Sequence, residues 1–183
     1  IHYRDESSSQ PLDLDRHPNV ATWRGTSQPA LPAVVNGSTI WDPDTSHQAS
    51  YAYVPYMITG DAFYQEEMAY WAGWNLTAMN PAYRSAGQGL LWEDQVRGQA
   101  WSMRALGEAA RTLPDTHPLK AYFQQRLSGN LEWFYQNWVL SPLPDVWPMG
   151  SPVNPYSTDT IAPWQNDFWA LVMAQHAQAQ EPR

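Results

Sequence analysis

The sequence predicts an all-α fold built from αα-hairpins that follow an irregular N-terminal segment. From Asp44 onward, apolar side chains recur at three- and four-residue steps, which is the spacing of one face of an α-helix. Short turns containing Gly, Asn or Pro separate these periodic stretches. Two helices joined by such a short turn form an antiparallel hairpin. We therefore expect an irregular segment over residues 1–43 and a helical-hairpin domain over residues 44–183.

The N-terminal segment contains few periodic signals. Prolines interrupt it repeatedly, at Pro11, Pro18, Pro29 and Pro32, and each one favours an extended or looped backbone. The best local strand candidate is 33–35, which ends at the turn signal Asn36-Gly37.

The first hairpin is expected to begin with a helix capped by Thr45 or Ser46 and running to about Thr59. Gly60 is expected to end this helix, because glycine adopts the left-handed conformation without a Cβ clash. Asp61 can then cap a second helix that runs to about Met79. One face of that helix carries Tyr64, Met68, Trp71, Asn75 and Met79.

The second hairpin is expected to contain helices over about 93–113 and 118–139. The interior of the first holds small residues, which let neighbouring backbones approach closely, so we expect this helix to be buried on more than one side: Gly98, Ala100, Ala105, Gly107, Ala109 and Ala110. Pro118 is suited to the first position of the second helix. One apolar face of that helix contains Leu119, Phe123, Leu127, Leu131, Phe134 and Trp138.

A proline-rich connection over residues 140–162 precedes a last helix, which Pro163 opens and which runs to about Gln180. This helix is expected to be the first half of a third hairpin. The three pairs form a repeat of supersecondary units with uneven spacing.

The composition excludes several classes of function. The chain has 183 residues, 43% apolar residues and a formal net charge of −8, which is typical of a globular domain and argues against binding to nucleic acid or to an anionic membrane surface. No stretch approaches the length of a transmembrane helix. The chain has no cysteine and no metal-binding or phosphate-loop motif, so neither a metal nor another cofactor is expected.

Tryptophan is unusually abundant, with eleven residues in the chain. Two interpretations are open: the rings fill the core, or some of them line a cleft that stacks on flat ligand faces such as those of sugars.

Polar and aromatic clusters open the first helix of each predicted hairpin, over residues 42–51, 92–101 and 163–169. The first helices of adjacent hairpins point in the same direction, so their N-termini are expected to gather on one rim. Free N–H groups and the positive dipole ends of the helices favour oxygen atoms there. Such a rim is suited to binding a carbohydrate.

Four motifs stand out in the helical region: Asp44-x-x-His47, the run 51–56, the Thr59-Gly60-Asp61 turn followed by Tyr64, and the helix start 94–101. Together they resemble (α/α) toroid proteins of the six-hairpin glycosidase type, nearest to bacterial polysaccharide lyases and hydrolases. The resemblance covers about residues 41–180. It implies that the hairpins form part of an (α/α) toroid whose concave rim binds a glycan.

His47 is the candidate general base of this rim, or a group that neutralises a uronate carboxylate. On the predicted helix it shares a face with Tyr51, and either Tyr51 or Tyr53 would donate or remove a proton. The structural alternative is that Asp44 only caps the helix and His47 only packs.

Glu93, Asp94 and Asp167 are further candidate catalytic acids. Hydrolysis of a glycoside requires two carboxylates facing each other across the scissile bond, so a partner for the adjacent Glu93 and Asp94 must come from another hairpin, from Asp44 or Asp167. The alternative for Glu93 and Asp94 is ordinary charge at a helix N-terminus.

Arg97 either binds a sugar carboxylate through its planar guanidinium or pairs with Asp94. The substrate-binding candidates are Tyr53, Trp92, Gln95, Arg97, Trp101, Trp164 and Trp169. Other tryptophans, in the second helices of the hairpins, are expected to pack.

The function expected from these features is that of a polysaccharide lyase or glycoside hydrolase domain. The alternative is a non-catalytic glycan-binding or structural scaffold module. The expected partner is an oligo- or polysaccharide, which favours a secreted, periplasmic or cell-surface location. A partial toroid exposes apolar hairpin flanks, so we also expect association with a second copy or with a polypeptide that completes the ring.

Overall fold

The computed structural model describes residues 4–5, 7–20, 44–92, 95–140 and 162–180. Within these ranges all the regular secondary structure is helical and no β-strand occurs, which confirms the all-α prediction. The elements in order are η1 (Thr45–His47), α1 (Tyr53–Thr59), α2 (Ala62–Ala78), η2 (Ala86–Gln88), α3 (Val96–Thr112), α4 (Lys120–Phe134), the π-helical turn η3 (Tyr135–Leu140) and α5 (Pro163–Gln180).

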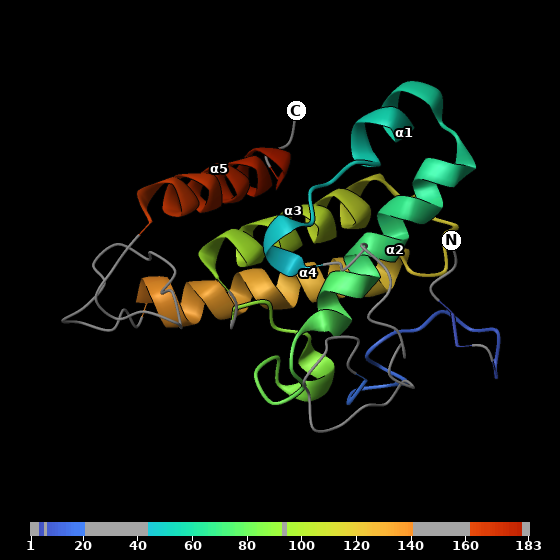
Figure 1. Cartoon of the computed structure of the whole chain (residues 1–183), viewed down its shortest axis with the longest axis horizontal. Helices are drawn as coiled ribbons and strands as arrows, with labels where there is room; N and C mark the ends of the chain where they lie inside the picture. The colour runs from blue at the N-terminus through green and yellow to red at the C-terminus, as the bar shows by residue number, and fades with distance from the viewer. Residues whose placement is uncertain (1–3, 6, 21–43, 93–94, 141–161, 181–183) are drawn as a thin grey trace, which may run out of the picture.

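Helix α3 is the centre of the molecule. It packs against α2, α4, α5 and η1, and its small residues are buried as the sequence predicts. Figure 1 shows α5 running beside α3 in the same direction, whereas α4 runs the opposite way. The side chains that pack on α3 include Leu76, Phe123, Trp169 and Val172, which belong to one apolar core.

The turn between α1 and α2 has the predicted capping chemistry. Gly60 ends α1 in the left-handed conformation, with a φ of 64°, and its N–H donates to the Tyr56 carbonyl. The Asp61 carboxylate accepts a 2.8 Å hydrogen bond from the N–H of Phe63 at the start of α2. The local signals at Gly60 and Asp61 therefore place this helix boundary correctly.

The predicted single helix from Thr45 to Thr59 is wrong. The chain makes a short 3₁₀ turn at η1, continues without helix over residues 48–52 and begins α1 only at Tyr53. Pro55 explains the difference, because it has no N–H to donate to the Tyr51 carbonyl and so fits only in the first turn of a helix. His47 and Tyr51 therefore do not share a helical face.

Helix α4 also differs from its prediction at both ends. It begins at Lys120, so Pro118 precedes the helix instead of occupying its first position. At the other end, α4 passes into the π-helical turn η3. The predicted apolar face is correct: Leu119, Phe123, Leu127 and Phe134 are buried, and Leu131 and Trp138 are partly buried against them.

The described part of the N-terminal segment, residues 4–20, is irregular and lies on the helical body. Leu12, Leu14 and Val20 enter the same core as the helices, and the Leu14 N–H donates to the Tyr122 hydroxyl of α4. The strand candidate at 33–35 lies outside the described residues.

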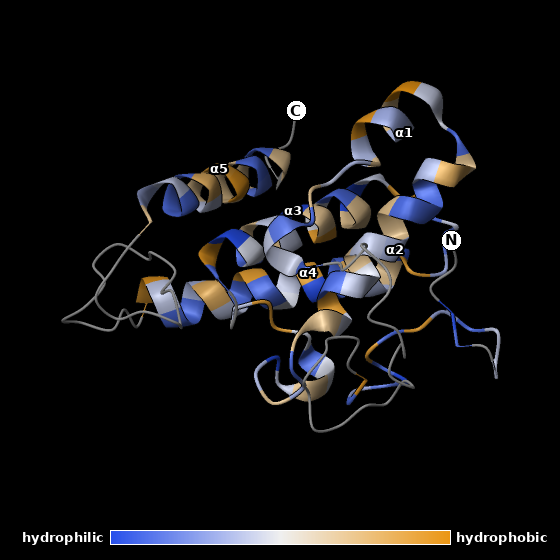
Figure 2. Cartoon of the chain, viewed as in Figure 1, coloured by the Kyte–Doolittle hydropathy of each residue, from blue (hydrophilic) through white to orange (hydrophobic). Residues whose placement is uncertain are grey.

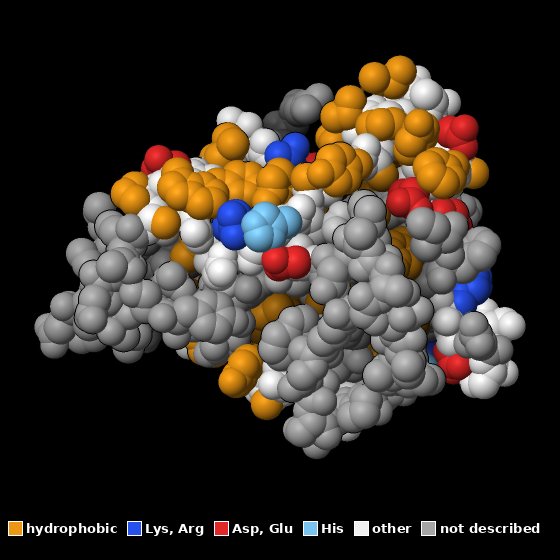
Figure 3. Space-filling view, in the orientation of Figure 1, with side chains coloured by type: hydrophobic (Ala, Val, Ile, Leu, Met, Phe, Trp, Pro, Cys, Tyr) orange, Lys and Arg blue, Asp and Glu red, His pale blue; other side chains and the backbone are white. Residues whose placement is uncertain are grey.

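An apolar surface covers α1 and the outer side of α5. Figure 2 shows hydrophobic residues on both helices, and Figure 3 shows their side chains as a band across one face of the molecule. The exposed large apolar side chains of these two helices include Val54, Met57, Ile58, Trp164 and Leu171. Association through this surface stays a prediction. Among the described helices, none is long and apolar enough to cross a lipid bilayer.

Candidate functional site

The second and third predicted helix openings meet where α3 and α5 begin. The backbone N–H of Arg97 donates to the Gln165 side-chain oxygen at 3.1 Å. The Arg97 guanidinium lies over the Trp164 ring, 5.4 Å from its centroid, and also donates to the Gln95 side-chain oxygen. We call this group of α3 and α5 residues the α3–α5 rim: Gln95, Arg97, Trp101, Trp164, Gln165 and Phe168.

Trp164 is the exposed aromatic residue of the α3–α5 rim, with 54% of its surface accessible. Trp101 is half-buried, because its ring contacts that of Phe168, with centroids 4.5 Å apart. The Arg104 guanidinium lies 5.8 Å from the Trp101 ring centroid. The rim therefore combines two tryptophans, each with a guanidinium beside it.

Arginine recurs along α3 at a spacing that sequence reasoning did not use. Arg97, Arg104 and Arg111 follow each other at intervals of seven residues, which places them on nearly one face of the helix, about 10.5 Å apart. Arg104 pairs with Glu108 at 3.0 Å, and Arg111 donates to His176 at 2.8 Å. The seven-residue repeat was the signal that could have revealed this row.

The first predicted opening forms a histidine–carboxylate pair on η1. Asp44 Oδ2 lies 2.7 Å from His47 Nδ1, and Asp44 Oδ1 accepts the N–H of Ser46. Both partners are largely exposed. Because the carboxylate can only accept, it holds the proton on Nδ1 and leaves Nε2 as the basic nitrogen of the neutral ring. Asp44 therefore caps η1 through one carboxylate oxygen and contacts His47 through the other.

Segment 48–52 links this pair to the C-terminal half of α3. The Ser50 hydroxyl donates to the buried carboxylate of Glu108, and Figure 1 shows η1 crossing in front of α3. Tyr51 is 68% exposed, whereas Tyr53 is partly buried against the core. The residues of η1 therefore lie against the side of α3 and not at its N-terminus.

The other aromatic candidates have different surroundings. Trp92 stacks on Trp133, with centroids 5.1 Å apart and an interplanar angle of 22°. Trp169 is 6% exposed and packs edge-on against Phe134 of α4. Trp169 is therefore a core residue in this structure, and we do not include it in the α3–α5 rim.

The carboxylates proposed for hydrolysis are placed only in part. Glu93 and Asp94 lie outside the described residues. Asp167 is exposed on α5. Within the described parts of the chain, no three His, Asp or Glu side chains come together in a group that could hold a metal ion.

Cavities occur at other places in the molecule. One, of about 270 Å³, lies between the N-terminal segment, α2 and the α3–α4 connection. A second, of about 820 Å³, is an open groove between α4 and α5 that Arg111 and His176 help to line. Tyr51 lines a small cavity of about 10 Å³ beside α2.

Comparisons with known proteins supply no relative: no protein-family model matches the chain, and no curated protein or solved structure matches it either.

Proposed function

We propose that this chain is a carbohydrate-active domain and that the α3–α5 rim binds an acidic glycan. The observation that carries the proposal is the half-exposed Trp164 ring with the Arg97 guanidinium beside it. The apolar face of a sugar stacks on an exposed indole, and a planar guanidinium binds a carboxylate through two parallel hydrogen bonds. Together they suit a sugar that bears a carboxylate.

The arginine row of α3 supports an acidic ligand despite the net charge of −8 of the chain. When charges of one sign lie on one helix face, the electrostatic potential near that face determines which ions it attracts, and the net charge of the chain does not. Arg97 is the member of the row in the rim, whereas Glu108 offsets the charge of Arg104. We therefore assign carboxylate recognition to Arg97.

The arrangement of the helices agrees with the proposed partial toroid. Helices α3 and α5 run side by side in the same direction, with α4 antiparallel. This is the relation expected between the first helices of successive hairpins, and it brings the N-termini of α3 and α5 together at the rim.

The Asp44–His47 pair favours a lyase over a hydrolase as the catalytic form of this function. In a lyase reaction on a uronate, Nε2 of His47 would take the proton from the carbon next to the carboxyl group. The electron pair of that bond would form a carbon–carbon double bond, the bond from carbon to the glycosidic oxygen would break, and the leaving oxygen would take a proton from water. A hydrolase would instead need two facing carboxylates.

Calorimetric titration of the protein with oligogalacturonate and with its carboxyl-reduced counterpart tests binding at the rim. We expect Trp164→Ala to weaken binding of both ligands about tenfold or more, because the stacking surface is lost. Arg97→Gln should weaken only the binding of the acidic ligand. Leu171→Ala, an equally exposed position on α5, is the matched control and should leave both affinities unchanged.

Equal binding of both ligands by the wild-type and all three variant proteins would refute the α3–α5 rim as the glycan site. Catalysis is measured separately, through the ultraviolet absorbance of unsaturated uronate. That absorbance should grow with the wild-type protein and be lost in His47→Gln. If new reducing ends appear without the absorbance, the protein is a hydrolase instead. If neither signal appears, the protein binds the glycan without cleaving it.

A further inference from the structure

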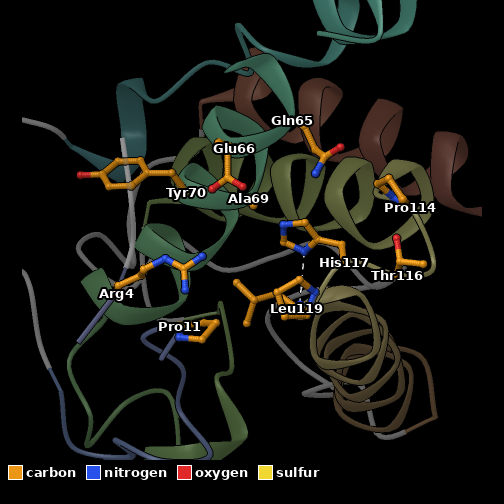
Figure 4. Close-up of a pocket in the computed structure, with 11 residues that line it drawn as sticks. Arg4, Pro11, Gln65, Glu66, Ala69, Tyr70, Pro114, Thr116, His117 and Leu119 are labelled. Atoms are coloured by element: carbon orange, nitrogen blue, oxygen red, sulfur yellow. Dashed lines mark hydrogen bonds between the residues drawn. The ribbon is translucent and has the colours of Figure 1, made fainter. Parts of the chain in front are cut away.

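The cavity shown in Figure 4 lies away from the α3–α5 rim and brings together residues from three distant parts of the chain. It has a volume of about 270 Å³. We call it the His117 cavity. Its lining includes Arg4 and Pro11 of the N-terminal segment, Glu66 and Ala69 of α2, and His117 and Leu119 of the α3–α4 connection.

His117 presents a fixed hydrogen-bond donor in this cavity. Its Nδ1 atom accepts the N–H of Leu119 at 3.2 Å, so the ring proton of neutral His117 is on Nε2. Partial burial lowers the pKa of His117, the nearby Glu66 carboxylate raises it and the Arg4 guanidinium lowers it further, with a net decrease. The ring is therefore neutral at pH 7, with Nε2–H as its donor.

Opposite charges stand on different walls of the His117 cavity. Figure 4 shows the Arg4 guanidinium, the Glu66 carboxylate and the His117 ring turned toward the same space, and both charges act on this one ring. Arg4 is held in place by its hydrogen bond to the Ser9 carbonyl and by the backbone bridge between Arg4 and Pro11. The two charges therefore belong to one site.

The remaining walls are mostly apolar and stiff. Pro11, Pro114 and Pro118 contribute rings whose backbone φ is fixed, and Ala69 and Leu119 are buried. A ligand that meets this surface buries an apolar group while its polar groups face Arg4, Glu66 and His117.

We propose that the His117 cavity binds a small zwitterion of the amino-acid class with a compact apolar side chain. The ligand carboxylate would face Arg4 and the Nε2–H of His117, and the ligand ammonium would face Glu66. A simple carboxylate would be repelled by Glu66, and a simple amine would be repelled by Arg4. Only a ligand carrying both charges complements the two walls.

Three ligands of one shape test this assignment by calorimetric titration at pH 7.5. They are L-valine, isobutylamine, which is valine without its carboxylate, and 3-methylbutanoate, which is valine without its ammonium group. We expect saturable binding of L-valine at millimolar concentration or below. Each singly charged analogue should bind at least tenfold more weakly.

Charge-removing variants distinguish the two walls. Glu66→Gln should weaken valine binding at least tenfold and reduce the ratio of the affinity for valine to that for 3-methylbutanoate. Arg4→Gln should also weaken valine binding, but it should reduce the ratio of the affinity for valine to that for isobutylamine. Asp115→Asn, an exposed change on the same α3–α4 connection, is the control and should bind valine as the wild type does. No saturable binding of valine, equal binding of the three ligands, or equal valine affinity in all the proteins would overturn the proposal.

Discussion

His176 is a buried histidine whose surroundings oppose its protonation. It is 3% exposed, and its Nδ1 accepts a hydrogen bond from the Arg111 guanidinium. Arginine is always a donor, so the proton of the neutral ring is on Nε2. Burial lowers the pKa of His176 to about 4, with the positive charge of Arg111 as the second cause, while the Met103 backbone raises it slightly.

This depressed pKa makes stability depend on pH in a defined direction. Between pH 6.5 and pH 4 the unfolded chain binds a proton at His176 that the folded chain does not, so the free energy of unfolding decreases as the pH falls through this range. The decrease from this residue should reach about 2–3 kcal/mol near pH 4 and should be absent above pH 6.5.

Urea unfolding at several pH values measures this contribution. His176→Gln keeps an acceptor oxygen for Arg111 and has no titrating ring, so its stability should decline less than that of the wild type between pH 6.5 and pH 4. If stability declines with pH to the same extent in the wild type and in His176→Gln, the surroundings of His176 do not oppose its protonation.

The contact between α3 and α5 depends on the absence of a side chain at Gly107. A Cβ atom built there would lie 2.1 Å from Cε1 of His176 and 3.0 Å from the Arg111 guanidinium. Real Cβ atoms do not approach other atoms so closely, so Gly107→Ala must displace the buried imidazole or separate the helices. Helix propensity alone would favour alanine by about 1 kcal/mol, but overpacking of this kind costs about 1–3 kcal/mol and more when a buried ring is displaced.

We therefore expect Gly107→Ala to lower the free energy of unfolding by about 1–3 kcal/mol. Gly129→Ala is the matched control: this glycine also lies inside a helix, but a Cβ there meets no atom within 4 Å, so stability should rise by about 0.5–1 kcal/mol. Thermal and chemical unfolding measure both variants. Adding His176→Ala to Gly107→Ala should recover part of the loss, and equal effects of the two glycine variants would contradict this account of the α3–α5 contact.

Local chemistry predicted some helix boundaries and not others. Gly60 and Asp61 act within one turn of the backbone, so their sequence signals were sufficient. The apolar periodicity before Gly60 predicted one long helix, and this prediction ignored Pro55. Because Pro55 fits only in the first turn of a helix, α1 begins after Ala52. The correct start of α1 was therefore readable from the sequence through the missing N–H of proline.

The site was less predictable because the aromatic residues of α5 point in several directions. Trp164 is exposed, Phe168 contacts Trp101, and Trp169 is buried against Phe134. Periodicity does not decide which ring faces the core when rings occur on every side of a helix. The His117 cavity was also hidden, because Arg4, Glu66 and His117 are far apart in sequence and only the tertiary fold brings them together.

At the scale of the whole molecule, residues 7–20 pack against the helices through an ion pair and hydrogen bonds. Arg126 of α4 pairs with Asp15 and lies over the Tyr122 ring. Asn130 joins α4 to the chain before α3, since its amide donates to the Gly89 carbonyl and its oxygen accepts the N–H of Leu91. Irregular backbone thus gains its order from polar side chains of the helices.

Arg84 is the strongest of these connections, and its loss should loosen the N-terminal segment first. It is fully buried, and its guanidinium donates to five backbone carbonyls, those of Pro18, Val20, Thr77, Met79 and Ala86. Arg84→Met leaves these buried acceptors without their donor and should cost about 3 kcal/mol or more of stability. Lysine has only three donors at one point and should recover only part of that loss.

Hydrogen exchange measured by mass spectrometry separates this effect from general destabilisation. In Arg84→Lys, the amides of residues 7–20 should exchange faster than in the wild type, while those of α5, which Arg84 does not contact, should change little. Ser8→Ala, which removes an exposed hydrogen bond to Asp5 in the same segment, should cost less than about 1 kcal/mol and leave the exchange pattern in place. Uniform acceleration across α5 and residues 7–20 in Arg84→Lys would mean that the segment and the helices unfold together, and that Arg84 does not hold the segment as a separate unit.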